Sequence, residues 1–309
     1  MRPQLRANRY EDEIATKDTG CLAPLLPFMF AEDTRTREQL LDELKDLTKI
    51  LKRSQKCAQN HFPEPAWNEA VHYPILELAL EGLAGVEYRN VYGRRRSLIQ
   101  YLIQRLMFSS TTASVVPSLV PRHANGDILQ SKIVDYTINL QPNNEMRGMI
   151  LRLLEGQPFG LRTINQTMCD HVRYLPIAIS IEAKTPDASA QEAKIQLGMW
   201  VAAHFNRLRT LSHENVVLPT LPLLYVSGKW WYLLFACDRA QHIVCSSSTY
   251  LICQVLTFWQ ELLGELLIGD TNSVVGCYKL LAALRCLAGW VTTTFKEWLE
   301  LEVLQPNSV

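Results

Sequence analysis

The sequence lacks the short motifs that mark several common enzyme classes. It contains no Gly-x-Gly-x-x-Gly or phosphate-binding loop, and Ser246-Ser-Ser248 stands in no Gly-x-Ser-x-Gly context. The 7 histidines show no His-x-x-x-His or comparable spacing, and none of the 8 cysteines belongs to a Cys-x-x-Cys pair. These absences argue against nucleotide-loop enzymes, serine hydrolases and zinc proteins, and they favour reduced, buried thiols.

The chain also lacks a basic surplus, because 31 Lys and Arg residues balance 31 Asp and Glu residues. Proteins that attract nucleic acid through charge alone usually carry excess positive charge. The balance argues against a strong general DNA-binding protein, and any nucleic-acid surface would be local. One dense basic cluster, Arg94-Arg95-Arg96, opens an apolar helix predicted over residues 97–108. This cluster is either a solvated face or a contact for the nucleic-acid backbone.

A signal peptide and an uninterrupted bilayer-spanning run are missing as well. The N-terminus has no apolar core, and polar residues or prolines interrupt the most apolar segments. We therefore expect an intracellular protein, cytoplasmic or nuclear, without a membrane partner.

Length and composition favour an ordinary globular domain, with 309 residues of which 48% are hydrophobic and 20% charged. We expect a flexible arm over residues 1–33 and a single domain over 34–309. Its fold class is α/β, with a mixed central sheet flanked by helices and a C-terminal helical extension. The patterns predict strands over 86–92, 132–140, 174–184, 222–226, 229–236 and 241–246, and helices over 36–58, 66–80, 97–108, 145–155, 189–208, 249–269 and 272–304.

The strand over 174–184 carries the strongest chemical signal. Large residues alternate along it, and it ends in Glu182-Ala-Lys184. Because residues two apart on a strand point to the same side, Glu182 and Lys184 project together. Acid-x-Lys also occurs at residues 43–45 and 192–194, but there it lies in polar, helix-like stretches. The pair at 182 and 184 is either a strand-end ion pair of small energetic value or part of a metal-dependent site.

Three further polar residues interrupt otherwise apolar elements. Asp135 lies on the strand over 132–140, opposite its apolar face. Glu69 shares a helical face with apolar residues, so it lies either at the edge of the buried stripe or in a polar site. Gln196 is a polar member of the apolar stripe of the helix over 189–208.

This order of elements, with an Asp on one strand and Glu-x-Lys at the end of the next, resembles the PD-(D/E)XK nuclease superfamily. The resemblance extends to an acid on the preceding helix and a Gln on the following one. Four segments over residues 35–300 are similar to the fungal PD-(D/E)XK nuclease-like domain proteins. They are Trp67-Asn-Glu-Ala-Val-His72, Ile133-Val-Asp135, Pro176 to Lys184, and Gln196 to Ala203.

The resemblance implies a restriction-endonuclease-like core and metal-dependent hydrolysis of phosphodiester bonds in DNA or RNA. Asp135 and Glu182 would hold Mg²⁺ or Mn²⁺, and Glu69 would bind a second ion or a water. Lys184 would orient or deprotonate the attacking water and stabilise the transition-state charge. Gln196 would hydrogen-bond the nucleophile or a phosphate oxygen.

The sequence leaves the use of this fold open. The chain could be a binding module without cleavage, or a small-molecule enzyme of a specialised, secondary-metabolite pathway. That alternative predicts an enclosed apolar pocket lined by residues such as Trp230, Trp231 and Tyr232. An interaction protein with a vestigial acid–lysine set is a third reading. Finally, the long separation of Asp135 from Glu182 indicates an insertion over residues 141–173, which would form a lid, a substrate-selecting surface or a partner site.

Overall fold

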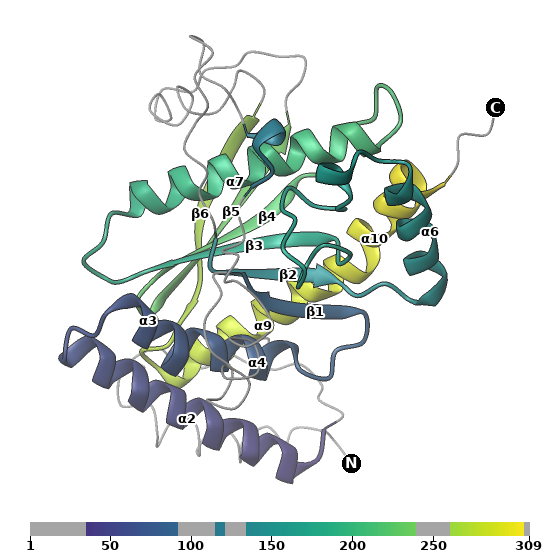
Figure 1. Cartoon of the computed structure of the whole chain (residues 1–309). Helices are drawn as coiled ribbons and strands as arrows, with labels where there is room; N and C mark the ends of the chain where they lie inside the picture. Colours follow the sequence, from purple (N-terminus) through teal and green to yellow (C-terminus); the bar gives the residue numbers. More distant parts are fainter. Residues whose placement is uncertain (1–34, 92–114, 121–133, 239–259, 306–309) are drawn as a thin grey trace, which may run out of the picture.

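The computed structural model describes residues 35–91, 115–120, 134–238 and 260–305 (Figure 1). In this part of the chain, six strands form one mixed sheet in the order β1-β2-β3-β4-β5-β6. Only the β3–β4 pair is parallel, and the other neighbours are antiparallel. The α/β class with a mixed sheet is therefore confirmed. The strands are β1 Val86–Asn90, β2 Tyr136–Leu140, β3 Ile177–Lys184, β4 Leu221–Ser227, β5 Trp230–Asp238 and β6 Gln260–Asp270.

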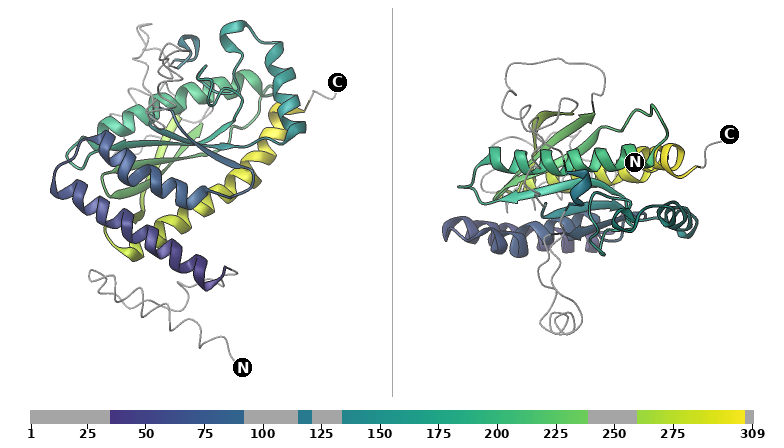
Figure 2. Two further views of the ribbon diagram at one scale, coloured as in Figure 1. Left: turned by 60° about the horizontal axis from the view of Figure 1, so that its bottom comes forward. Right: turned by 45° about the horizontal axis from the view of Figure 1, so that its top comes forward.

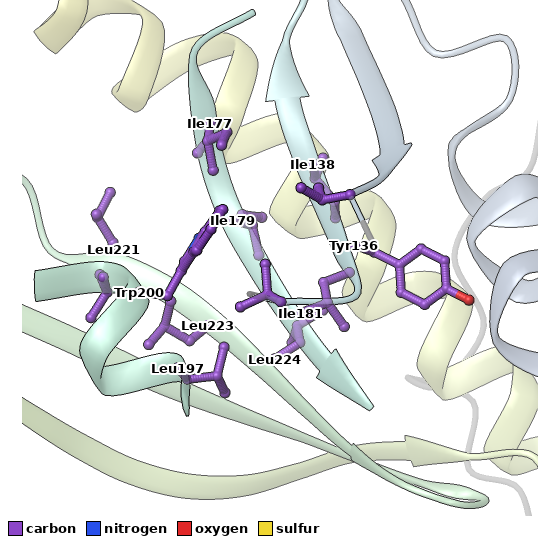
Figure 3. Packing of buried hydrophobic residues seen from close by; sticks show 14 of the residues in the cluster. Tyr136, Ile138, Ile177, Ile179, Ile181, Leu197, Trp200, Leu221, Leu223 and Leu224 are labelled. Atoms are coloured by element: carbon purple, nitrogen blue, oxygen red, sulfur yellow. The ribbon is translucent and has the colours of Figure 1, made fainter. Parts of the chain in front are cut away.

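The sheet is buried on both faces around β2 and β3. Every residue of β2, and every residue of β3 except Lys184, is buried. Apolar side chains of β3 pack with Tyr136 and Ile138 of β2 and with Leu223 and Leu224 of β4 (Figure 3). Burial of this continuous core supplies the main driving force for pairing these strands.

Helix α7, Ala190–Leu211, connects the parallel strands β3 and β4. Such a crossover needs a helix long enough to return along the sheet. Ser189 caps its N-terminus by accepting the Glu192 N–H, as the predicted start of this helix requires. The helix packs on one face of the sheet, where Trp200 Nε1 donates to Ser180 Oγ of β3. Figures 1 and 2 show α7 on this face and the N-terminal helices on the other.

Helix α2, Arg37–Gln59, begins with a capping box between Thr36 and Gln39. The next helical stretch runs from Glu64 to Leu80 as α3 Glu64–Trp67, a π turn η2 Asn68–His72, and α4 Tyr73–Leu80. This stretch is divided just before Pro74. Because Pro74 has no N–H, the hydrogen-bond register changes before it, and the Tyr73 N–H donates to the Asn68 carbonyl.

The C-terminal part corrects one prediction. Residues 260–269 form most of strand β6, whereas a helix was predicted over 249–269. Leu-rich spacing fits a helix, but pairing with β5 overrides this local preference, and Gly264 adopts a φ of +77° that a helix does not tolerate. The predicted helix over 272–304 is confirmed as α9 Val274–Trp290, η5 Val291–Phe295, α10 Lys296–Leu299 and η6 Glu300–Leu304.

This last helix, Val274–Leu304, is the one described helix long and apolar enough to cross a membrane by length and composition. Lys279 and Arg285 interrupt its apolar sequence. Its apolar residues, including Leu280, Leu284 and Phe295, belong to the hydrophobic core that contains the sheet. The helix thus has the position of a core helix.

The segment predicted as an insertion, residues 141–173, contains α6 Asn144–Glu155 and the short 3₁₀ helix η4 Phe159–Leu161. A buried polar loop follows. Arg207 of α7, fully buried, donates to the Thr163 and Leu161 carbonyls, which fixes this loop against α7. Thr167 of this loop forms an isolated antiparallel β-bridge with Val115. The short 3₁₀ helix η3, Pro117–Leu119, follows Val115. The predicted arm over 1–33, helix over 97–108 and strand over 241–246 lie outside the described residues.

Candidate metal-dependent active site

Asp135 and Glu182 lie opposite each other where β2 begins and β3 ends. Tyr136 pairs with Ile181 in the antiparallel register, so the residue before β2 faces Glu182 on the same side of the sheet. Both carboxyls are buried, with Asp135 3% and Glu182 2% exposed. Asp135 Oδ2 accepts the Ala183 N–H at 2.8 Å. The fold thus brings two acids that are distant in sequence into one buried position.

Lys184 completes this group. Its Nζ donates to Glu182 Oε1 at 2.6 Å, as the shared side of the strand requires. The same Nζ lies 3.6 Å from Glu64 Oε2 at the start of α3. Glu182 Oε2 is buried and has no hydrogen-bond partner among the residues that the structure describes. A buried carboxylate oxygen without a partner is costly, and it is available to a ligand that enters from outside the chain.

Burial controls the ionisation of this group. It raises the pKa of Asp135 to about 7, and Glu64 adds to the effect by repulsion. Burial together with repulsion from Asp135 raises the pKa of Glu182 to about 8. Burial lowers the pKa of Lys184, but the nearby carboxyls outweigh it, so the pKa rises overall. At neutral pH the lysine is therefore a cation, and the two acids compete for protons.

A profile of the PD-(D/E)XK nuclease superfamily matches residues 17–296. The chain belongs to the PD-(D/E)XK nuclease superfamily. Comparisons with curated proteins and with solved structures gave no match. The narrower likeness to the fungal nuclease-like domain proteins stays a prediction.

Within this PD-(D/E)XK fold, the acid of the N-terminal helices that lies near Lys184 is Glu64 and not the predicted Glu69. Glu69 is exposed, and it is not among the charged groups that shift the pKa of Asp135, Glu182 or Lys184. Glu64 has that position instead. The helix begins at Glu64, before the predicted start at residue 66, and the π turn changes which residues share a face. Pro65 in the first helical turn was a sequence signal for this earlier start.

Asn68 is a second residue that the sequence reasoning missed. Its Nδ2 donates to Asp135 Oδ1 at 3.3 Å, and it is one helical turn after Glu64. Asn68 Oδ1 lies 2.8 Å from His72 Nδ1, and His72 Nε2 lies 2.7 Å from the Gly228 carbonyl. Burial lowers the pKa of His72 to about 4, so the imidazole is neutral at physiological pH. This chain of contacts fixes Asp135 relative to the β4–β5 turn.

The remaining predicted site residues are Gln196 and the arginine cluster at residues 94–96. Gln196 is half-buried on α7, between the buried Ala193 and Trp200 that pack toward the sheet. Its proposed role toward a nucleophile or phosphate stays a prediction. Arg94, Arg95 and Arg96 lie outside the described residues.

The aromatic run of β5 does not form the pocket that the alternative reading predicted. Trp231 is fully buried in the core, where it meets His72 edge-on at 5.7 Å. Tyr232 is half-buried and stacks on Tyr225 at 5.6 Å, whereas Trp230 lines a separate cavity. Successive strand residues point to opposite faces, so these three side chains cannot share one enclosed pocket.

Proposed function

We propose that this PD-(D/E)XK chain is a metal-dependent nuclease that hydrolyses phosphodiester bonds in DNA or RNA. The observation that carries the proposal is the buried pair Asp135 and Glu182, with Lys184 bonded to Glu182 on the same side of β3. Two carboxylates and a lysine at one end of a sheet provide ligands for a cation and a positive charge for a phosphate.

The donor set fits a single hard divalent cation. Mg²⁺ is typically held by one or two carboxylates, with waters and substrate phosphate completing the shell. Asp135 and Glu182 supply two carboxylates, and the unpartnered Glu182 Oε2 gives the cation an oxygen that no protein group occupies. Among the described residues, no three His, Cys, Asp or Glu side chains gather closely enough to form a larger metal cluster. One Mg²⁺ or Mn²⁺, instead of the two that a role for Glu69 would imply, suits this geometry.

When bound, such a cation neutralises charge on the scissile phosphate and lowers the pKa of a coordinated water. Lys184, held as a cation by its carboxyl neighbours, stabilises the negative charge that develops on the phosphate oxygens. Asn68 positions Asp135 through the 3.3 Å hydrogen bond and does not act on the substrate itself.

The test is cleavage of labelled DNA and RNA, single-stranded and duplex, with Mg²⁺ or Mn²⁺ and with EDTA. Glu182→Gln and Lys184→Ala are each expected to lower the cleavage rate by about 10²-fold or more. The matched control is Glu192→Gln. Glu192 is an exposed acid on α7 and belongs to another Glu-Ala-Lys tripeptide, at residues 192–194. Metal-dependent cleavage that survives both site substitutions would contradict the proposal, as would metal binding without cleavage of any nucleic acid.

A further inference from the structure

A cavity of about 440 Å³ lies beside the candidate site and is not used by the proposed chemistry. Its walls come from the end of α2, the start of α3, the loop after β3 and the β4–β5 turn. Figure 1 shows these elements together at the same end of the sheet. We call this cavity the side groove, and Phe62, Pro63, Thr185, Lys229 and Trp230 are among its lining residues.

The side groove is joined to the acid–lysine group by the chain itself. Pro63 precedes Glu64, and Thr185 follows Lys184. The Gly228 N–H donates to the Lys184 carbonyl at 2.7 Å, so the β4–β5 turn is fixed to the end of β3. Any ligand portion in the groove therefore has a defined position relative to the site.

The sheet register gives the separation. Lys184 pairs with Ser227 on β4, and Ser227 pairs with Trp230 on β5. Paired residues point to the same face, so the Trp230 and Lys184 side chains share a face two strands apart. Two strand spacings place the backbones of Lys184 and Trp230 about 10 Å apart. One or two nucleotides span this distance.

The lining combines flat apolar surfaces with the cation of Lys229 and the exposed carboxyl group of Asp187. Trp230 and Phe62 are half-buried, which leaves part of each ring accessible. Lys229 Nζ lies 5.3 Å from the centre of the Trp230 ring and also donates to Asn272 Oδ1 at 2.9 Å. These contacts keep a positive charge beside an aromatic face. Aromatic rings that stack bases and cations that pair with phosphates are the usual components of single-strand nucleic-acid sites.

We propose that the side groove binds an unpaired nucleobase of the strand being cleaved, stacked on Trp230, with Lys229 pairing with the adjacent phosphate. The proposal rests on the proposed nuclease function and narrows its substrate class. A paired base cannot reach the groove without leaving its stack, which costs free energy. Single-stranded DNA or RNA, or a frayed end, is therefore the preferred substrate over an intact duplex.

The binding test uses the full chain in EDTA, so that it does not depend on catalysis. The probes are short DNA and RNA single strands that carry 2-aminopurine, together with duplexes of the same sequence. Wild type is expected to quench 2-aminopurine in the single strands and to bind the duplexes more weakly. Trp230→Ala is expected to weaken single-strand binding by about tenfold, and Trp230→Phe, which keeps a stacking ring, to restore most of it.

Two controls separate stacking from a general loss of structure. Trp298→Ala removes another half-buried tryptophan, on α10, and is expected to leave binding unchanged. Lys229→Ala should reduce the slope of log affinity against log salt concentration by the amount expected for about one phosphate contact. Lys45→Ala, which removes an exposed lysine on α2, should leave this slope unchanged. If Trp230→Ala does not fold, Trp230→Leu against Trp230→Phe provides the same comparison.

The outcomes distinguish this proposal from the nuclease function. Quenching that is lost in Trp230→Ala supports the groove, even where wild type cleaves nothing and the nuclease function fails. Cleavage by wild type with equal binding of duplex and single strand, or with binding unaffected by Trp230→Ala, overturns the groove alone. A DNA-only or RNA-only response identifies which nucleic acid supplies the base.

Discussion

Glu182→Gln is expected to stabilise the metal-free protein at pH 8 and to reduce the dependence of its stability on pH. A carboxyl whose pKa rises from 4.5 to about 8 on folding disfavours the folded state by about 5 kcal/mol at alkaline pH. For Asp135, the rise from 3.8 to about 7 corresponds to about 4 kcal/mol. The two penalties are coupled, so their sum is an upper bound.

The sign follows from the direction of the shifts. Both acids bind protons more tightly in the folded state than in the unfolded state. Their contribution to the stability of the metal-free fold is therefore most favourable below pH 4. That stability is lost as the pH rises from the unfolded pKa values of 3.8 and 4.5 to the folded values of about 7 and 8. Lys184, whose pKa is raised above 10.5, keeps its charge over this range and does not change the slope.

Replacing Glu182 by Gln removes its penalty and relieves Asp135, but it also removes the charged hydrogen bond to Lys184, worth about 2 kcal/mol. The net gain at pH 8 is about 3 kcal/mol, which corresponds to a rise in Tm of about 5 °C. Thermal unfolding by circular dichroism in EDTA between pH 5 and pH 8 measures it. Glu192→Gln is the control and should follow wild type at each pH. A Glu182→Gln protein that is less stable than wild type at pH 8, or a wild type that gains stability from pH 5 to pH 8, would refute the reasoning.

Three further predictions concern the parts that hold the site. Gly228→Ala should destabilise the fold by about 2–4 kcal/mol in thermal unfolding, because φ is +53° and the new Cβ would lie 2.5 Å from a side-chain atom of the loop after β3. The control is Gly160→Ala, which should have little effect because the new Cβ would have no neighbouring atom within 4 Å. Equal destabilisation by the two substitutions would contradict this prediction. Arg207→Met should lower the free energy of unfolding by about 3 kcal/mol in denaturant titrations, because it leaves buried carbonyls of the 157–163 loop without donors. An unchanged free energy of unfolding would show that the loop does not need these hydrogen bonds. Asn68→Ala should weaken Mn²⁺ affinity about tenfold in titration calorimetry, because Asp135 loses its 3.3 Å hydrogen bond; unchanged affinity would remove the positioning role.

Much of the core could be predicted because local and global preferences agree there. Strand β3 alternates large residues on one side with small or polar residues on the other, and only a strand places Glu182 and Lys184 together. The capping box at Thr36 and the cap at Ser189 marked two helix starts within a residue. The position of Asp135 opposite Glu182 followed from the superfamily resemblance, since no local pattern specifies a strand register.

The parts that were missed depend on tertiary contacts. Strand β6 has helix-like leucine spacing, and its pairing with β5 includes register shifts that no two-residue alternation reveals. Glu64 was overlooked because Pro63 and Pro65 resemble a chain break, although a proline in the first turn also favours a helix start. Glu64 and Asn68 lie one helical turn apart and face the acid–lysine group, whereas Glu69, the next residue, is exposed.

The central claim is that Asp135 and Glu182 together hold a divalent cation. Anomalous diffraction from crystals soaked in Mn²⁺ at pH 8, above the raised pKa values of both acids, tests it most directly. We expect one peak within coordination distance of carboxylate oxygens of both residues, and no such peak in Glu182→Gln crystals treated in the same way. Manganese bound elsewhere, with no peak between these two carboxylates, would contradict it.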